Sequence, residues 1–490
     1  MVAAESMLSA IPAPPVATSV PVGFRVCLDR RVRSWSKGAV LVGGAPWRIA
    51  RIDPRARPFV DQLRANGRAG CAAVSGLERS VARLLIDRGF AHPMIHASGS
   101  PAITIVVPAY GRTAALGRCL DSLQNSPVLV VDDCSPDSGA VAAAAAAGDA
   151  RLVRHTENRG PAAARNTGLK ETSGELVAFM DSDCTADPGW LDALAAHFAD
   201  PLVALVAPRV LPDTRGGGLL ARHEAARSAL DMGRLPELVK PGARLGFVPS
   251  AAIVVRRSAL GDGFDESLRL GEDVDMVWRL TEAGWHVRFD PSVTVTHETR
   301  TQPVEWITRR FQYGTSAADL AMRHPGKLAP ARVSGWNMAA LACLVAGRQR
   351  TAAAIAVSAS ALLLRRLVLA PADALLAPVT VATGVVADGA ATGHALRREW
   401  WPIGALCLLF AGRSRLARAG AVAMIAPIAW EYAKYRPDVD PVRYTTVRLV
   451  EDAAYGSGVI ASTLRRRTIA SLKPEVRLPF VNARRPKASP

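Results

Sequence analysis

The chain has 490 residues, 49% of them hydrophobic, which is enough apolar material for two or three globular domains. Its 60 Lys and Arg exceed its 43 Asp and Glu, and the resulting charge of +17 suits nucleic acid, an anionic membrane surface or phosphorylated substrates. The sequence contains neither a basic patch interleaved with aromatic residues nor a known nucleic-acid reader motif, so we expect no nucleic-acid partner.

The first 22 residues lack the basic start and continuous apolar core of a signal peptide, so we interpret residues 1–22 as a flexible leader. The seven cysteines are scattered and form no CxxC pair. This spacing argues against a disulfide framework or a zinc site and fits a reducing compartment.

Residues 23–93 predict a small α+β domain, because short apolar or β-branched runs alternate with segments of helical spacing. The expected strands lie at 23–29, 39–44 and 47–52, and the expected helices at 59–63 and 77–90. A linker of small and polar residues follows.

Residues 101–325 alternate strand and helix, the rhythm of an α/β domain built on a parallel or mixed sheet. The expected strands are 103–110, 127–135, 151–158 and 175–183, and the expected helices are 112–124, 141–148 and 161–174. In such sheets, ligands bind beyond the carboxyl ends of the strands. The segments VVDD and FMDSD place acidic residues at two such ends.

Residues 326–435 predict a hydrophobic helical region that associates with a membrane. Its apolar segments are 336–347, 351–364, 367–386, 402–412 and 419–430. Only 367–386 approaches the length of a spanning helix, and Arg residues punctuate the runs, which favours interfacial helices or one or two poor spans. The alternative is an all-helical soluble domain. Residues 436–490 are interpreted as a basic tail.

Asp181 and Asp183 follow the apolar run LVAFM and are separated by one residue. In an extended chain both side chains therefore point to the same side, and a loop can aim them at one point. Two carboxylates can hold Mg²⁺ or Mn²⁺ while water and substrate phosphates complete its shell. The DxD pattern also occurs by chance in solvated loops, but its place at a strand end favours a cation site.

Asp132 and Asp133 end another expected strand. Either they open a turn, or one carboxylate accepts a hydrogen bond from the imide N–H of a uracil or thymine ring, with Tyr110 packing on the base. Arg165 lies one turn into a helix that begins near Pro161, where a phosphate or another anion is favoured. The alternative is that Arg165 is an ordinary surface residue of the helix and binds no anion.

Glu272 and Asp273 stand at the head of an expected helix, directly after Gly271. Acidic residues often cap helices, but a carboxylate held there beside a cleft could also act as general base for a sugar hydroxyl. Trp278 lies among the apolar positions that can pack inward. His297 ends a strand downstream, and a neutral imidazole could complete a manganese shell.

Taken in order, VVPAY, VVDDCSPD, ENRGPAAARNTGL, FMDSDC, GFDESLRLGEDVDMVWRL and VTHE resemble family 2 glycosyltransferases of the GT-A fold, a Rossmann-like mixed sheet. The resemblance implies an inverting, metal-dependent transfer from a nucleotide-diphosphate sugar. It implies Asp273 as the base and a divalent cation, Mn²⁺ or Mg²⁺, on Asp181, Asp183 and His297. The donor side is assigned to Pro108, Tyr110, Asp132, Asp133, Arg165 and Asp181, and the acceptor side to Glu272 and Trp278.

The QxxRW motif of processive polysaccharide synthases is missing from this pattern, since the corresponding segment reads RRFQYG. Synthesis of a polymer through a membrane pore is therefore not indicated. The arrangement with His297 is more similar to the rhamnosyl- and galactofuranosyl-type members.

The whole chain resembles the mycofactocin system glycosyltransferases of actinobacteria, and residues 23–93 resemble the winged-helix-like peptide-recognition fold of the pyrroloquinoline quinone peptide chaperone. This implies transfer of glucose, as from UDP-glucose, to mycofactocin or its precursor peptide, building a β-1,4-glucan chain at the cytoplasmic face of the cell membrane. The precursor or its peptide chaperone would be the partner. The alternatives are a rhamnosyl- or galactofuranosyl-type transferase acting on a lipid-linked cell-wall glycan, and a peptide-binding scaffold without catalysis.

Overall fold

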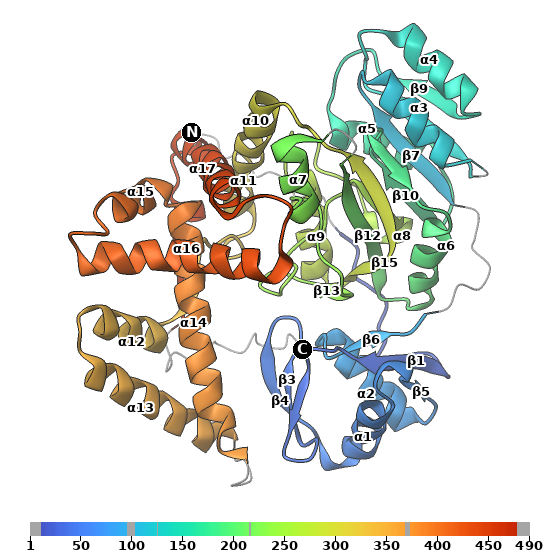
Figure 1. Ribbon diagram of the computed structural model, residues 1–490. Coiled ribbons are helices and arrows are strands. Elements are labelled where there is room, and N and C mark those ends of the chain that lie inside the picture. The colour runs from blue at the N-terminus through green and yellow to red at the C-terminus, as the bar shows by residue number, and fades with distance from the viewer. Residues whose placement is uncertain (1–10, 96–102, 125, 215–216, 368–372, 478–490) are drawn as a thin grey trace, which may run out of the picture. The chain divides into compact units, whose positions relative to one another are not determined.

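The computed structural model describes residues 11–95, 103–124, 126–214, 217–367 and 373–477 (Figure 1). The chain divides into two compact units, Met1–Thr301 and Gln302–Pro490. The second unit begins before residue 326, the start predicted for the helical region, because two further helices belong to it.

The first part of unit 1 is a small α+β domain, as the sequence predicts. Its strands are β1 (Phe24–Leu28), β2 (Arg33–Trp35), β3 (Val40–Gly43), β4 (Arg48–Arg51), β5 (Cys71–Ala73) and β6 (Ala91–Pro93), and its helices are α1 (Arg57–Asn66) and α2 (Gly76–Asp87). Strand β1 lies between β5 and β6 in one antiparallel sheet, and β2, β3 and β4 form a second. Helix α2 begins with a capping box between Ser75 and Glu78.

The described part of the expected leader makes specific contacts. Residues 11–22 contain no helix or strand. The indole Nε1 of Trp285 nevertheless donates to the carbonyl of Pro12 at 2.7 Å. Val20 is fully buried, and its N–H donates to the carbonyl of Arg79 at 3.2 Å. These contacts hold the segment against the rest of unit 1, which its composition does not indicate.

The second part of unit 1 contains a mixed sheet of nine strands among the described residues, ordered β11-β15-β12-β14-β10-β7-β8-β9, with β13 paired to β15. The strands are β7 (Thr104–Ala109), β8 (Val128–Asp132), β9 (Arg151–Arg154), β10 (Leu176–Met180), β11 (Cys184–Ala186), β12 (Val203–Asp213), β13 (Glu237–Val239), β14 (Ala252–Arg256) and β15 (His286–Glu298). Strands β10, β7, β8 and β9 run parallel, whereas β14 is antiparallel to its neighbours β10 and β12.

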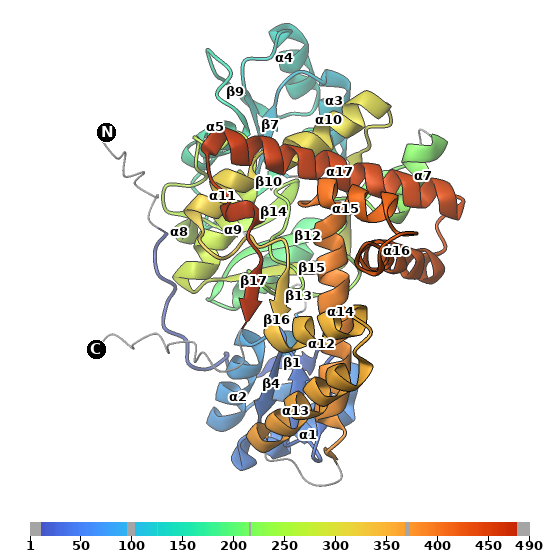
Figure 2. The same ribbon diagram turned by 90° about the vertical axis from the view of Figure 1, so that its left-hand side faces the viewer.

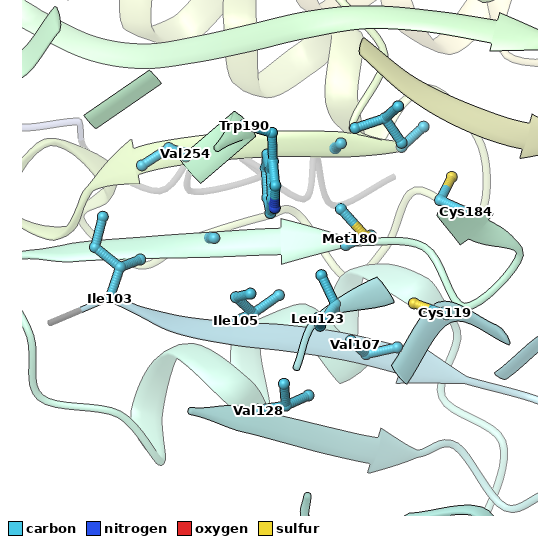
Figure 3. Packing of buried hydrophobic residues seen from close by; sticks show 14 of the residues in the cluster. Ile103, Ile105, Val107, Cys119, Leu123, Val128, Met180, Cys184, Trp190 and Val254 are labelled. Atoms are coloured by element: carbon cyan, nitrogen blue, oxygen red, sulfur yellow. The ribbon is translucent and has the colours of Figure 1, made fainter. Parts of the chain in front are cut away.

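Helices cover both faces of this sheet, which explains why its central strands are continuous apolar runs. The helices are α3 (Thr113–Ser122), α4 (Ser138–Ala147), α5 (Pro161–Lys170), α6 (Trp190–Ala195), α7 (Gly218–Ala226), α8 (Arg257–Leu260) and α9 (Glu272–Ala283). Ile105 and Val107 of β7 pack in one core with Cys119 of α3 and Trp190 of α6 (Figure 3). Val106 points to the opposite face, against α5.

A buried ionic cluster joins the small domain to the catalytic sheet within unit 1. Nη1 of Arg83 donates to both carboxylate oxygens of Asp200 at 2.9 Å. Nη2 of Arg288 lies 3.1 Å from Nδ1 of His92. Burial is the main cause that lowers the pKa of Arg288 to about 10. Because a buried charge is costly unless it is paired, the pair of Arg83 with Asp200 holds the small domain on the sheet.

Unit 2 is helical, as predicted, apart from the short parallel strands β16 (Arg332–Ser334) and β17 (Glu475–Arg477). Its helices are α10 (Pro303–Gly314), α11 (Ala317–Arg323), α12 (Gly335–Val345), α13 (Gln349–Leu367), α14 (Leu376–Arg397), α15 (Trp401–Leu409), α16 (Arg415–Tyr435) and α17 (Pro441–Arg466) (Figure 2). Within the described ranges, none of these helices combines the length and the hydropathy that a membrane span requires.

Helix α17 corrects the prediction that residues 436–490 form a basic tail. Its 26 residues bury one face, and that face is partly charged. Arg448 donates to Glu451 at 2.6 Å, Arg310 of α10 donates to the same carboxylate at 2.9 Å, and Arg397 of α14 donates to Asp452 at 2.6 Å. The basic composition of this segment did not indicate that its charges pair with each other and with other helices. The remainder of the predicted tail, residues 478–490, lies outside the described residues.

Candidate active site

The parallel strands β10, β7 and β8 bring several candidate residues to one edge of the sheet. Asp181 directly follows β10, Asp132 ends β8, and Tyr110 directly follows β7. Strand β15 contributes His297, because it pairs antiparallel with β11 and sets Cys184 opposite His297. The predicted convergence of these segments at the carboxyl ends of the strands is therefore present.

A buried arginine connects two of the predicted acidic residues. Nη2 of Arg165 donates to Oδ1 of Asp181 at 2.7 Å, and Nη1 donates to Oε1 of Glu272 at 2.8 Å. The Arg165 side chain is 4% exposed, and its guanidinium also lies over the ring of Phe264 at 5.4 Å. The sequence indicated an anion-binding role for Arg165, and the anions that it contacts are carboxylates of the chain itself.

Glu272 and Asp273 open helix α9, after Gly271 with its φ of 82°. Burial, followed by the charge of Asp273, raises the pKa of Glu272 to about 7. Burial also raises the pKa of Asp273, although its carboxylate accepts hydrogen bonds from the N–H of Val274 at 2.8 Å and of Ser250 at 3.4 Å. Sequence position at a helix start does not indicate this burial, which works against the charged form of both carboxylates.

Asp183 lies close to His297, as a shared ligand role would require. Nε2 of His297 is 3.4 Å from Oδ1 of Asp183, while Arg112 donates to Oδ2 of Asp183 at 3.1 Å. Across the described part of the chain, however, no three His, Cys, Asp or Glu side chains gather as a ready metal shell. Asp181 points toward Arg165 instead. Contacts within the protein therefore do not bring Asp181 together with Asp183 and His297, the other two predicted metal ligands.

Asp132 and Asp133 are both buried and engaged by the chain. Oδ1 of Asp132 accepts from the N–H of Ser135 at 2.9 Å. Asp133 accepts from the N–H of Arg159 at 2.9 Å and of Gly160 at 2.7 Å. The bond to Asp132 holds the turn after β8, and the bonds to Asp133 hold the loop before α5, so both carboxylates fix backbone segments at this edge.

His155 is a member of this network that sequence reasoning missed. Its Nδ1 lies 2.8 Å from Oδ1 of Asp133, and its Nε2 lies 2.8 Å from Oγ1 of Thr167 on α5. The spacing of His155 directly after β9 could have indicated it, because β9 runs parallel to β8 and ends at the same edge.

The remaining predicted residues differ in exposure. The Tyr110 side chain is 55% exposed, as a residue that packs on a bound base would have to be. Pro108 lies within β7. Trp278 is buried, and its Nε1 donates to the carbonyl of Gly246 at 2.8 Å, so this side chain supports the loop beside α9.

Helix α5 positions two parts of the site, the side chain of Arg165 and the loop that leads to α9. Oδ1 of Asn166 accepts a hydrogen bond from the N–H of Phe264 at 2.8 Å, and Nδ2 of Asn166 donates to the carbonyl of Phe264 at 2.8 Å. These two bonds fix the loop that leads to α9. Gly168 allows α5 to approach β7 closely, because a Cβ at this position would lie 2.1 Å from Cγ1 of Val106. Arg165 is thus placed by tight packing one turn away.

The chain is similar in sequence to a family of known proteins over its α/β domain. The model of the family described as "Glycosyl transferase family 2" matches residues 104–264, the stretch from β7 to the loop before α9. The solved structure of a mannosyltransferase from Pyrobaculum calidifontis has 19% identity, a TM-score of 0.42, and coverage of 76% of this chain and 90% of its own.

Relatives extend the likeness beyond the catalytic domain. The chain is 38% identical over 475 residues to proteins named "Pre-mycofactocin glycosyltransferase" from two strains of Mycobacterium tuberculosis, which covers 94% of this chain and 99% of theirs. It is 27% identical to the glycosyltransferase AglE of Haloferax volcanii, over 44% of this chain and 72% of that one. Since identity of 38% runs over nearly the full length of both proteins, the chain belongs to the pre-mycofactocin glycosyltransferase family and is a family 2 glycosyltransferase.

Proposed function

We propose that this enzyme transfers glucose from UDP-glucose to pre-mycofactocin, with inversion at the anomeric carbon, and extends the product as a β-1,4-glucan. The observation that carries the acceptor is the 38% identity with relatives named for pre-mycofactocin, which includes the small N-terminal domain. Glucose, the β-1,4 linkage and chain extension rest on the family resemblance alone.

The side chains at the sheet edge can perform such a transfer. Asp273 accepts the proton of the acceptor hydroxyl while that oxygen attacks the anomeric carbon, and the bond to the diphosphate oxygen breaks with its electron pair. Asp273 stands at a helix start, and Asp132, Asp133 and Tyr110 stand at the strand ends proposed for the nucleotide, with Pro108 within β7 beside them. Glu272 would lie toward the acceptor.

A divalent cation fits the donor set at this edge. Asp181 and Asp183 offer hard carboxylate oxygens, and His297 lies beside Asp183. The small number of protein ligands suits Mg²⁺ or Mn²⁺, which keeps positions for substrate phosphates. Such a cation would offset the negative charge that develops on the departing diphosphate.

Chelation followed by titration with Mn²⁺ tests the cation site. We expect EDTA to abolish transfer, and Asp183→Ala to raise the Mn²⁺ concentration for half-maximal activity roughly tenfold or more. The control is Asp192→Ala, which removes an exposed carboxylate on α6 and should leave the Mn²⁺ titration unchanged. Full activity after chelation, or the same titration for both variants, would exclude the proposed ligands.

A mass-spectrometric transfer assay tests the reaction itself. Purified enzyme with Mn²⁺ is offered UDP-glucose together with either pre-mycofactocin or a lipid-linked glycan acceptor. We expect successive additions of hexose to pre-mycofactocin. Transfer only to the lipid-linked acceptor, or only from a rhamnose or galactofuranose donor, would contradict the proposed substrates. Peptide binding with no transfer from any of these donors would favour a scaffold.

The small N-terminal domain is proposed to hold the precursor peptide or its chaperone. Its helix α2 exposes Leu77 and Leu84, which are seven residues apart and therefore lie on one face of the helix. The buried cluster around Arg83 and Asp200 fixes this domain on the catalytic sheet. A peptide held there would reach the active site from a constant position.

A further inference from the structure

Two connections between helices of unit 2 lie next to each other. We call them, with the adjoining helix ends, the arginine tip, residues 344–350 and 406–418. The first connection joins α12 to α13, and the second joins α15 to α16. A Cβ on Gly347 in the first connection would lie 3.1 Å from Nη1 of Arg415 in the second. Figure 2 shows α12, α13, α15 and α16 on the side of unit 2 that faces the viewer.

The arginine tip exposes large apolar side chains. Leu344 is 48% exposed, Leu409 69% and Leu416 72%. Helix α15 is apolar along its whole length, yet Gly404 is its one residue that the structure describes as buried. Apolar side chains are not stabilised by contact with water. An apolar helix that is exposed on nearly every side therefore indicates a surface that a partner covers.

The charges around these side chains have one sign. The exposed arginines are Arg348, Arg350, Arg413, Arg415 and Arg418. The sequence has no Asp or Glu at 335–367 or at 400–430. Among the described residues, no ion pair joins these five arginines to an acidic side chain, and Arg418 donates to the carbonyl of Ala411 instead. The tip is therefore cationic as well as apolar.

We propose that the arginine tip docks on an anionic phospholipid surface, with the leucines entering the interface and the arginines contacting lipid phosphates. Exposed apolar residues with a basic rim are the combination that binds such surfaces. In this arrangement the protein lies on the bilayer through the arginine tip. The proposal does not depend on the identity of sugar or acceptor.

Flotation of the full-length protein with vesicles tests this docking. We expect binding to phosphatidylcholine vesicles that contain phosphatidylglycerol, and much weaker binding to phosphatidylcholine alone. Replacing Arg413, Arg415 and Arg418 together by Gln should lower the partition coefficient roughly hundredfold, because each arginine contributes about fivefold near such a surface. Leu409→Ser with Leu416→Ser should weaken binding to the same vesicles even at low salt.

The control variant carries the same charge change elsewhere, with Arg51, Arg55 and Arg57 replaced by Gln. These arginines are exposed in the small domain, and we expect vesicle binding close to that of the unchanged protein. Circular dichroism establishes that every variant is folded. Equal loss of binding in both triple variants, or no binding by the unchanged protein, would overturn the proposal. A dimer that the leucine variant abolishes, without vesicle binding, would identify a second copy as the partner and overturn it too.

Discussion

Asp273→Asn is expected to lower kcat roughly a thousandfold while binding of the nucleotide sugar changes little. The substitution keeps the shape of the side chain but removes its ability to accept a proton, and general base catalysis typically contributes 10²–10⁴-fold. The amide oxygen of Asn can keep the 2.8 Å bond from the N–H of Val274, and neither this bond nor the 3.4 Å bond from Ser250 involves the strand ends assigned to the donor. Steady-state kinetics and calorimetric titration with donor measure the two effects.

The matched control for this variant is Glu282→Gln, the same chemical change on the same helix. Glu282 is exposed and lies nine residues further along α9, about 13 Å along the helix axis. Its kcat should equal that of the unchanged enzyme. A comparable kcat for Asp273→Asn, or a loss of donor binding without loss of kcat, would remove Asp273 from the role of base.

The pH profile follows from the same residue. Because burial raises the pKa of Asp273, kcat/KM should fall as pH decreases through a value above the ordinary range of a carboxyl group. The raised pKa of Glu272 belongs to the same interacting pair. Glu272→Gln removes a negative neighbour, so the acid limb of the profile should then move to lower pH.

Arg165→Met is expected to reduce both stability and transfer, more strongly than any surface change. It leaves the buried carboxylate of Glu272 and the partly exposed carboxylate of Asp181 without their shared counter-charge. Removing one partner of a buried ion pair typically costs about 3–5 kcal/mol. Thermal unfolding gives the change in stability, and kcat/KM as a function of pH gives the change at the site.

Two further observations distinguish a positioning role from a purely structural one. Arg165 lowers the pKa of both Glu272 and Asp273, so its loss should shift the acid limb of the profile to higher pH. Arg165→Lys should recover stability better than activity, since an ammonium group lacks the planar fork that spans two carboxylates.

The control for Arg165→Met is Arg159→Met, which breaks an exposed pair with Glu266 at 2.8 Å and should cost at most about 1 kcal/mol. An unshifted pH profile in Arg165→Met, with activity falling only as the protein unfolds, would contradict the positioning role.

Strand positions and the acids at their ends could be predicted from the sequence, because both depend on local pattern. The run LVAFM is apolar throughout and forms β10, and Asp181 follows it directly. Parallel pairing with β7 and β8 then places Tyr110 and Asp132 at the same edge. General rules for α/β sheets link these three steps.

Contacts between distant segments could not be predicted in this way. Arg165 and Glu272 are 107 positions apart, and only packing of α5 below the loop at Phe264 brings them to 2.8 Å. Helix α17 was missed for a related reason. Charges such as Arg448 and Glu451 suggest a solvated segment unless the partners on other helices are known.

The close approach of α5 to β7 at Gly168 limits which amino acids this enzyme can tolerate at that position. An added methyl group would lie 2.1 Å from Val106, so even alanine would push the helix outward or displace the strand. Either movement would carry Arg165 away from its two carboxylates. A residue with no side chain is therefore needed at this position to hold Arg165 in place. Mutational tolerance along α5 should accordingly be lowest on the face that touches the sheet.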